Sequence, residues 1–90
     1  MDWISVKDRL PKKDGKYLCV CKGFIGGYEY IEVLSYSKNL YKVDEYDFAS
    51  FKGKRGFYSY NSEWGYINKN NVTHWMPLPE LPKGMSDNDL

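Results

Sequence analysis

Two runs of alternating side chains, residues 16–22 and 28–36, flank a glycine-rich interruption and constrain the fold more than any other part of this sequence. Successive strand residues point to opposite faces, so both runs present apolar groups on both faces, which is typical of strands inside a sheet. In the first run one face carries Tyr17, Cys19 and Cys21, and the other carries Leu18 and Val20. In the second run one face carries Ile31 and Val33, and the other Tyr28, Tyr30, Leu34 and Tyr36. The glycines between the runs permit tight turn geometry, which predicts a hairpin.

The rest of the chain repeats this pattern in shorter pieces. Turn signals recur at intervals of roughly 8 to 12 residues, and no window has apolar residues sustained at helical spacing. Further strands are expected at residues 40–43, 57–60, 64–68 and 72–76. Residues 3–6 read as a short strand or one helical turn, and residues 48–56 as a strand-plus-loop insertion. The prediction is a mainly β fold: a small antiparallel sheet or half-barrel of about five or six short strands with at most one short helix.

Length and charge narrow the class of protein. Ninety residues make one domain with a modest core, expected at 1–83 with a flexible tail at 84–90, and aromatic side chains (18% of the residues) must supply much of that core. A formal charge of +1 argues against general binding to nucleic acid. We expect no membrane-spanning segment and no signal peptide, hence a cytoplasmic protein. The closely spaced Cys19 and Cys21 fit a reducing compartment.

Residues 72–82 begin as a strand and end as an extended, proline-rich arm. Together with Trp3-Ile4-Ser5-Val6-Lys7-Asp8-Arg9-Leu10-Pro11 and Gly15-Lys16-Tyr17-Leu18-Cys19-Val20, the string Val72-Thr73-His74-Trp75-Met76-Pro77-Leu78-Pro79-Glu80 resembles the family called domain of unknown function 551. Members of that family are small proteins found largely in bacteriophages and prophages. The resemblance implies a phage or prophage origin and the cytoplasm of a bacterial host cell. It implies no reaction, cofactor or catalytic residue, and it leaves residues 36–68 unmatched.

His74 is the only histidine, so it is the one candidate for imidazole chemistry. No Ser-His-Asp or Cys-His spacing accompanies it, and a hydrogen bond that holds the adjacent proline arm explains it without catalysis. We therefore expect no enzyme, with catalysis by His74 kept as an alternative. The two ends of the chain are expected to form a structural clasp, in which the arm packs near Trp3. The residues of this clasp are Trp3, His74, Trp75, Pro77 and Pro79.

No metal or other cofactor is expected. Two cysteines separated by one residue lack the spacing of a zinc knuckle, and small buried hydrophobes explain them better. The glycines at 23–27 precede a strand and are not followed by the Lys-Ser or Lys-Thr of a phosphate-binding loop. Hairpin geometry accounts for them.

Tyrosine has the widest functional range in this chain. Exposed tyrosines can anchor a protein partner, and with basic side chains they can stack on a nucleobase and contact phosphate. The candidate contact residues are Tyr28, Tyr30, Tyr36, Tyr46, Lys52, Lys54, Arg55, Tyr58 and Tyr60. The first hypothesis is a phage-type binding module for a host protein, such as a defence component. The alternative is a homo-oligomer that encloses a small nucleotide ligand or nucleotide signal.

Overall fold

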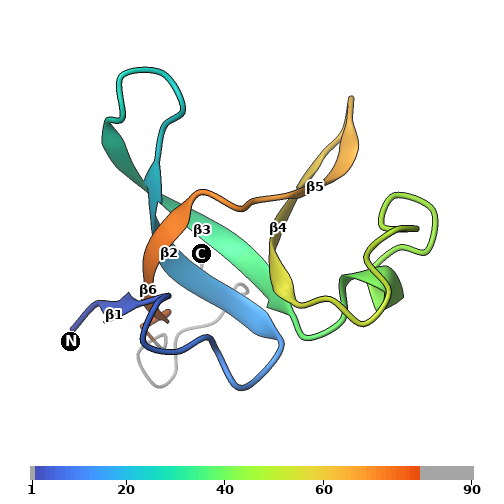
Figure 1. The fold of residues 1–90 in the computed structure, drawn as a ribbon, viewed down its shortest axis with the longest axis horizontal. Coiled ribbons are helices and arrows are strands. Elements are labelled where there is room, and N and C mark those ends of the chain that lie inside the picture. Colours follow the sequence, from blue (N-terminus) through green and yellow to red (C-terminus); the bar gives the residue numbers. More distant parts are fainter. Residues whose placement is uncertain (1, 80–90) are drawn as a thin grey trace, which may run out of the picture.

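The computed structural model describes residues 2–79 of the chain, which form one open antiparallel sheet of six strands (Figure 1). The elements are β1 (Ile4–Ser5), β2 (Gly15–Lys22), β3 (Glu29–Ser37), the 3₁₀ helix η1 (Leu40–Lys42), β4 (Gly56–Asn61), β5 (Gly65–Asn68) and β6 (Val72–Pro77). The strand order is β1-β6-β2-β3-β4-β5. The mainly β prediction is confirmed. The predicted tail at 84–90 and the arm beyond Pro79 lie outside the described residues.

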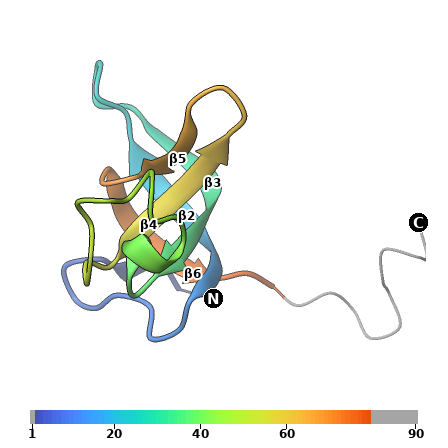
Figure 2. The same cartoon turned by 90° about the vertical axis from the view of Figure 1, so that its right-hand side faces the viewer.

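The hairpin of β2 and β3 is the longest part of the sheet. The two strands pair from Gly15 opposite Tyr36 to Lys22 opposite Glu29. On its other side β2 pairs with β6, so β2 is an interior strand, as its apolar residues on both faces predicted. β4 instead pairs with only the last three residues of β3 and then diverges from it. The hairpins β2–β3 and β4–β5 therefore spread apart toward one end of the molecule (Figures 1 and 2).

The main core lies on one face of the curled sheet. It receives alternate residues of β2 and β3 and the facing residues of β4 and β6, as the two-residue period requires. Its buried members are Cys19, Cys21, Leu34, Tyr36, Phe57, Val72 and Trp75, with Ile4, Val6, Leu10, Tyr17 and Tyr30 packed against them. The opposite face of β3 is more open, since Ile31 and Val33 remain 62% and 50% exposed. The two faces of this hairpin therefore differ in burial although both are apolar.

The prediction of a strand at residues 40–43 is wrong, because Leu40–Lys42 form η1. The chain turns sharply before it: the Ser37 hydroxyl donates to the carbonyl oxygen of Asn39 at 2.9 Å and accepts from the Asn39 N–H at 3.1 Å. Leu40 is fully buried, and its N–H donates to the carbonyl oxygen of Lys54 at 2.8 Å. A short run that was expected to be a strand thus forms a turn that buries the side chain of Leu40.

The strand-plus-loop prediction for residues 48–56 is also wrong in part, because this segment consists of turns until β4 begins at Gly56. It is anchored by Phe48, which is 1% exposed and whose ring lies 6.0 Å from each of the Tyr58 and Tyr66 rings. The segment lies beside β4, on the side of the molecule that faces the viewer in Figure 2. Phe48, Phe51, Tyr58 and Tyr66 thus form a second aromatic cluster. This part of the middle of the chain therefore contributes to the packing of the fold.

The two ends of the described chain meet in the sheet. β1 pairs with β6, placing Ile4 opposite Trp75 and Ser5 opposite His74. After this strand the chain makes one turn, in which the N–H groups of Asp8 and Arg9 donate to the carbonyl oxygen of Ser5. Residues 3–6 therefore combine the two predicted conformations. Within residues 2–79 no helix is long and apolar enough to cross a membrane.

Candidate interaction surface

Large apolar side chains stand exposed at the turns of both long hairpins. Phe24, Ile25 and Tyr28, at the turn between β2 and β3, are 85%, 88% and 62% exposed. Tyr60, near the end of β4, and Trp64, in the turn that follows it, are 65% and 75% exposed. We call these five residues the hairpin tips. Both turns lie at the same end of the molecule (Figures 1 and 2). An exposed apolar residue is ordinary when it is single, but a group of this kind at one end is typical of an interaction site.

The first tip is shaped by glycine. Gly26 and Gly27 have φ of 76° and 64°, in the left-handed region that side chains with a Cβ rarely adopt. At Gly23 a Cβ would come within 2.5 Å of the Tyr28 ring, so the absence of a side chain lets that ring lie against the backbone. The Gly23 N–H also donates to the carbonyl oxygen of Tyr28 at 2.7 Å. Phe24 lies in this turn, beyond the end of β2, and its side chain therefore does not reach the core.

The second tip is held by two polar side chains. The Asn61 side-chain oxygen accepts the N–H groups of Glu63 at 2.7 Å and Trp64 at 3.2 Å, which is the turn that asparagine favours. From the loop before β4, Asp47 Oδ2 accepts the Tyr66 N–H at 3.0 Å. These bonds fix the backbone beneath the exposed Trp64 ring. The second tip thus exposes an aromatic side chain on a hydrogen-bonded turn.

The six candidate tyrosines are divided by the fold. Tyr28, Tyr46 and Tyr60 are exposed, at 62%, 90% and 65%. Tyr30 is half-buried, and its hydroxyl accepts a hydrogen bond from Asn71 Nδ2 at 3.0 Å. Tyr58 is half-buried in the second aromatic cluster. These two are in part structural, whereas the first three can reach a partner.

Tyr36 must be removed from the candidate contact residues, because it is 1% exposed and its ring packs 5.0 Å from that of Phe57 in the main core. Burial raises the pKa of its hydroxyl, and the Arg55 guanidinium nearby opposes that rise. The alternation of β3 places Tyr36 on the same face as Leu34. The sequence pattern alone did not show which of the two apolar faces would be covered.

The candidate basic residues are exposed but do not gather around the tyrosines. Lys52 Nζ lies 5.5 Å from the centroid of the Tyr41 ring, which is within cation–π range. Lys54 supports η1 through its backbone carbonyl. Arg55 lines a small cavity of about 230 Å³. The predicted combination of tyrosine and basic side chains is therefore not assembled within one chain.

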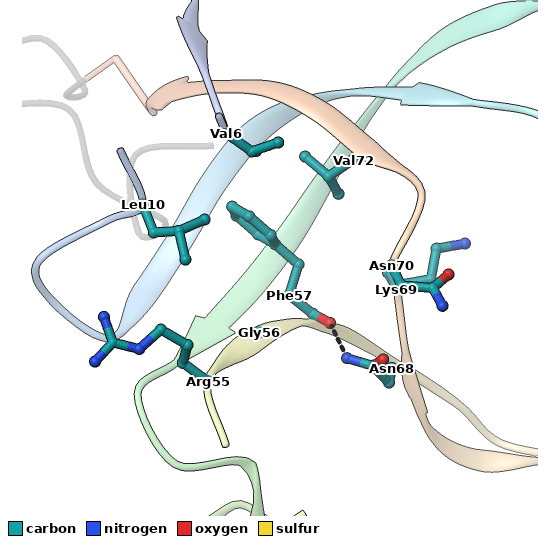
Figure 3. A pocket seen from close by; sticks show the side chains of 9 residues that line it. All are labelled: Val6, Leu10, Arg55, Gly56, Phe57, Asn68, Lys69, Asn70 and Val72. Atoms are coloured by element: carbon teal, nitrogen blue, oxygen red, sulfur yellow. Dashed lines mark hydrogen bonds between the residues drawn. The ribbon is translucent and has the colours of Figure 1, made fainter. Parts of the chain in front are cut away.

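The cavity beside Arg55 opens between the N-terminal turn and the start of β4 (Figure 3). The apolar side chains that line it are Val6, Leu10, Phe57 and Val72. The other lining residues are Arg55, Gly56, Asn68, Lys69 and Asn70. Asn68 Nδ2 donates to the carbonyl oxygen of Phe57 at 3.2 Å, so its amide is already used (Figure 3). Of the candidate contact residues, Arg55 alone lines this cavity.

His74 has a structural neighbourhood. It is half-buried on β6, opposite Val20 on β2, and its Nδ1 lies 3.0 Å from Thr73 Oγ1. Within residues 2–79 the ring hydrogen bond is made to Thr73. No acidic side chain is hydrogen-bonded to the ring among the residues that the structure describes.

The other clasp residues lie at the junction of the chain ends. Trp75 is buried in the main core, and Trp3, just before β1, is 38% exposed. Pro77 ends β6 opposite Tyr17, and Pro79 is exposed. The pairing of β1 with β6 joins the two terminal motifs, and the arm beyond Pro79 lies outside the described residues.

Both cysteines are fully buried on β2, where they pack as small hydrophobes as predicted. Burial, with the neighbouring Cys21 thiol as a second cause, raises the pKa of Cys19 to about 12, and burial also raises the pKa of Cys21. Neutral thiols are poor nucleophiles and poor metal ligands. No group of three or more His, Cys, Asp and Glu side chains in residues 2–79 is placed to hold a metal ion.

The prediction from sequence missed Phe24, Ile25 and Trp64. For Phe24 and Ile25 the signal was present, since they lie inside the glycine-rich turn at 23–27, where a core position is not available. Trp64 is part of the strand predicted at 64–68, whereas β5 begins at Gly65 and leaves Trp64 in the turn.

A family model described as "Protein of unknown function (DUF551)" matches residues 2–83 of the chain. The match includes the middle of the chain as well as the two terminal motifs that carry the resemblance, so the resemblance is confirmed. No curated protein and no solved structure matches the chain significantly.

Proposed function

We propose that this chain, which belongs to the DUF551 family, is a non-enzymatic protein-binding module whose binding surface is formed by the hairpin tips. The observation that carries the proposal is the group of five apolar side chains exposed at one end of the molecule. In keeping with the resemblance to phage and prophage proteins, the partner is a protein of the bacterial host. A component of a host defence system is the partner class that this origin favours.

The energetics of burial support this proposal. Burying a large apolar side chain completely contributes about 1.5 to 3 kcal/mol, and aromatic anchors account for much of the binding energy of protein interfaces. Trp64 and Phe24 are of this kind and are 75% and 85% exposed. Because neither contributes to the core, the fold gains little from them. Their value is greatest in a complex.

Rigidity supports the proposal further. A binding side chain loses less entropy when the backbone beneath it is already ordered. The Asn61 turn and the Asp47 contact hold the second tip, and the hydrogen bond from the Gly23 N–H to the Tyr28 carbonyl oxygen closes the first. The tips therefore resemble a preformed interface more than two loose loops.

The test is capture of a host protein by the immobilised chain, followed by identification and a binding measurement with the purified partner. The double variant Phe24→Ser/Trp64→Ser is expected to lose at least about tenfold in affinity, because two anchors are removed. Trp3→Ser is the control, since it removes an exposed aromatic residue that directly precedes β1, and β1 lies away from the two hairpin turns (Figure 1). Equal affinity of the double variant and the parent chain would exclude the tips as the binding surface.

A second candidate function is a nucleotide binder that works as a homo-oligomer. The observation that favours it is the apolar cavity with Arg55 on its rim (Figure 3). A neighbouring copy would have to supply a stacking tyrosine such as Tyr46. Thermal unfolding with and without ATP, GTP and cyclic dinucleotides tests this function: a rise in melting temperature that Arg55→Ala abolishes supports it, and no rise with any of them excludes it.

A further inference from the structure

The N–H and C=O groups of β3 alternate between β2 and the opposite edge. In an antiparallel pair every second residue exchanges both hydrogen bonds with its partner. The Gly23 N–H donates to the Tyr28 carbonyl at the end of the hairpin, which sets the phase of this alternation. Tyr30, Glu32 and Leu34 therefore point their backbone groups toward β2. The backbone groups of Glu29, Ile31 and Val33 point away from β2.

No strand covers those groups in the part of the chain that the structure describes. β4 pairs only with residues 35–37 of β3, and within residues 2–79 no backbone hydrogen bond reaches residues 29–34 from that side. The same alternation turns the N–H and C=O of Tyr60, on the diverging part of β4, toward the same gap. Between β3 and β4 lies a cleft of about 360 Å³. It is lined by Lys16, Glu32, Val33, Leu34, Ser35, Tyr58, Ser59 and Tyr60.

The two edge strands of the sheet are short, since β1 has two residues and β5 has four, whereas residues 29–34 of β3 lie open. β1 covers β6, and Pro77 at the end of β6 has no N–H to leave unpaired. On the outer edge of β5 the Asp47 carboxylate accepts the Tyr66 N–H. Proteins commonly blunt exposed edges because free backbone groups pair with other chains. β3 has no such cover, and its Ile31 and Val33 side chains are exposed beside the free groups.

We propose that the cleft between β3 and β4 binds an extended segment of a partner protein by strand addition, with backbone hydrogen bonds to Ile31 and Val33. The inference rests on the proposed function, because it assumes that the partner is a protein. It adds how the partner is bound: the tips supply side-chain contacts, and the cleft between the two hairpins binds an extended segment through backbone hydrogen bonds. The free backbone groups of β3 require an extended occupant, because an extended chain places its own N–H and C=O groups at the two-residue period of a strand.

The side chains of the cleft specify the partner segment further. Residues of the segment beside Ile31 and Val33 are apolar, because those side chains are the exposed ones on that face. The carboxylate of Glu32, which also lines the cleft, is already paired with Lys69 Nζ at 3.5 Å and sets no further charge requirement. The cleft therefore favours an extended segment with apolar residues beside Ile31 and Val33.

The β3 strand of a second copy is a poor occupant, because it already carries β2 along its other edge and the cleft is bounded on its far side by β4. A single extended segment brings no second strand with it, so we take the occupant to be one segment of another protein.

Amide hydrogen exchange of the isolated chain tests the open edge without any partner. The amides of Tyr30, Glu32 and Leu34 are expected to exchange at least about tenfold more slowly than those of Ile31 and Val33, because only the former are bonded to β2. Comparable protection of both sets would show that the edge is already covered. That result would overturn the inference.

Selection from a displayed library of random peptides of about seven residues, the length of a common strand, tests binding. Ile31→Pro removes the N–H that faces the cleft and keeps every bond to β2, whereas Ile31→Thr removes the same apolar side chain and keeps the N–H. Enriched peptides are expected to bind Ile31→Pro at least about tenfold more weakly than Ile31→Thr. No enriched peptide, or equal binding to both variants, would overturn strand addition.

The two proposals fail separately. If Phe24→Ser/Trp64→Ser abolishes capture of the host protein and Ile31→Pro does not, the tips bind and the cleft is not used. If Ile31→Pro weakens capture and the tip variant does not, the cleft binds and the tips are not the interface.

Discussion

The indole Nε1–H of Trp75 donates to the backbone carbonyl oxygen of Arg9 at 2.9 Å, joining residues 66 positions apart in the chain. Trp75 is 6% exposed and lies opposite Cys19 on β2 and Ile4 on β1. Its ring fills the core while its N–H holds the turn that follows β1. The two terminal motifs of the family thus meet at one side chain.

Replacement of Trp75 by phenylalanine is expected to lower the free energy of unfolding by about 2 to 3 kcal/mol, because it leaves a void and an unpaired carbonyl. Chemical denaturation measures this loss. Trp64→Phe is the control, and since Trp64 is 75% exposed its effect should stay below about 0.5 kcal/mol. Similar losses in both variants would contradict a structural role for Trp75.

Replacement of Phe48 by alanine is expected to cost about 3 to 4 kcal/mol of stability, as for other buried phenylalanines. Phe48 is 1% exposed and contacts the rings of Tyr58 and Tyr66. Tyr46→Ala, two residues away and 90% exposed, should leave the melting temperature nearly unchanged. A small effect of Phe48→Ala would mean that the second aromatic cluster does not stabilise the fold.

Two glycines with similar backbone angles separate backbone strain from close packing. Gly53 has φ of 75° and open space around it, so Gly53→Ala should cost about 1 kcal/mol from the left-handed conformation alone. Gly65 has φ of 78°, and a Cβ there would lie 2.6 Å from Asp47 Oδ2. Gly65→Ala should therefore cost more and should speed exchange of the Tyr66 amide, which Asp47 holds. Equal losses of stability would show that Asp47 moves away freely.

Alkaline pH is expected to destabilise the chain through its buried thiols. The pKa of Cys19 is about 12 in the folded protein, against 9.0 as the ordinary value, so between these pH values the unfolded thiol loses its proton and the folded one keeps it. Stability contributed by this difference is complete below pH 9 and is lost as pH rises toward 12, at no more than about 1.4 kcal/mol per pH unit. Denaturation curves across this range measure the slope, and Cys19→Ala should flatten it. An unchanged slope in Cys19→Ala would assign the effect to other groups.

Strand existence was predictable where alternation was long. Residues 16–22 and 28–36 appear as β2 and β3 with bounds shifted by about one residue, because a two-residue period over seven or more positions has no helical interpretation. Leu40 and its neighbours were too few to carry such a signal, and the need to bury Leu40 beside Gly56 decided their conformation.

The candidate site was predictable only in part. Aromatic content indicated that some tyrosines would be available. Tyr28 and Tyr36 share one face, and which of them was exposed depended on how far along that face the packing of distant segments extends. Pairing between distant strands decides that, and periodicity within one strand does not contain it. For the same reason Trp64 could not be told from a core tryptophan until its turn was placed.

By itself the sequence determined the class of the fold, the hairpin of β2 and β3 and the family, because alternation, turn residues and the two terminal motifs are local properties of the chain. Only the tertiary structure decided that β4 leaves β3 after three pairs, that Asp47 protects β5, and that the edge at Ile31 and Val33 stays open. These depend on contacts between segments far apart in the chain, where the packing of Phe48 and Phe57 sets the direction of β4. The proposed binding surface arises from that divergence.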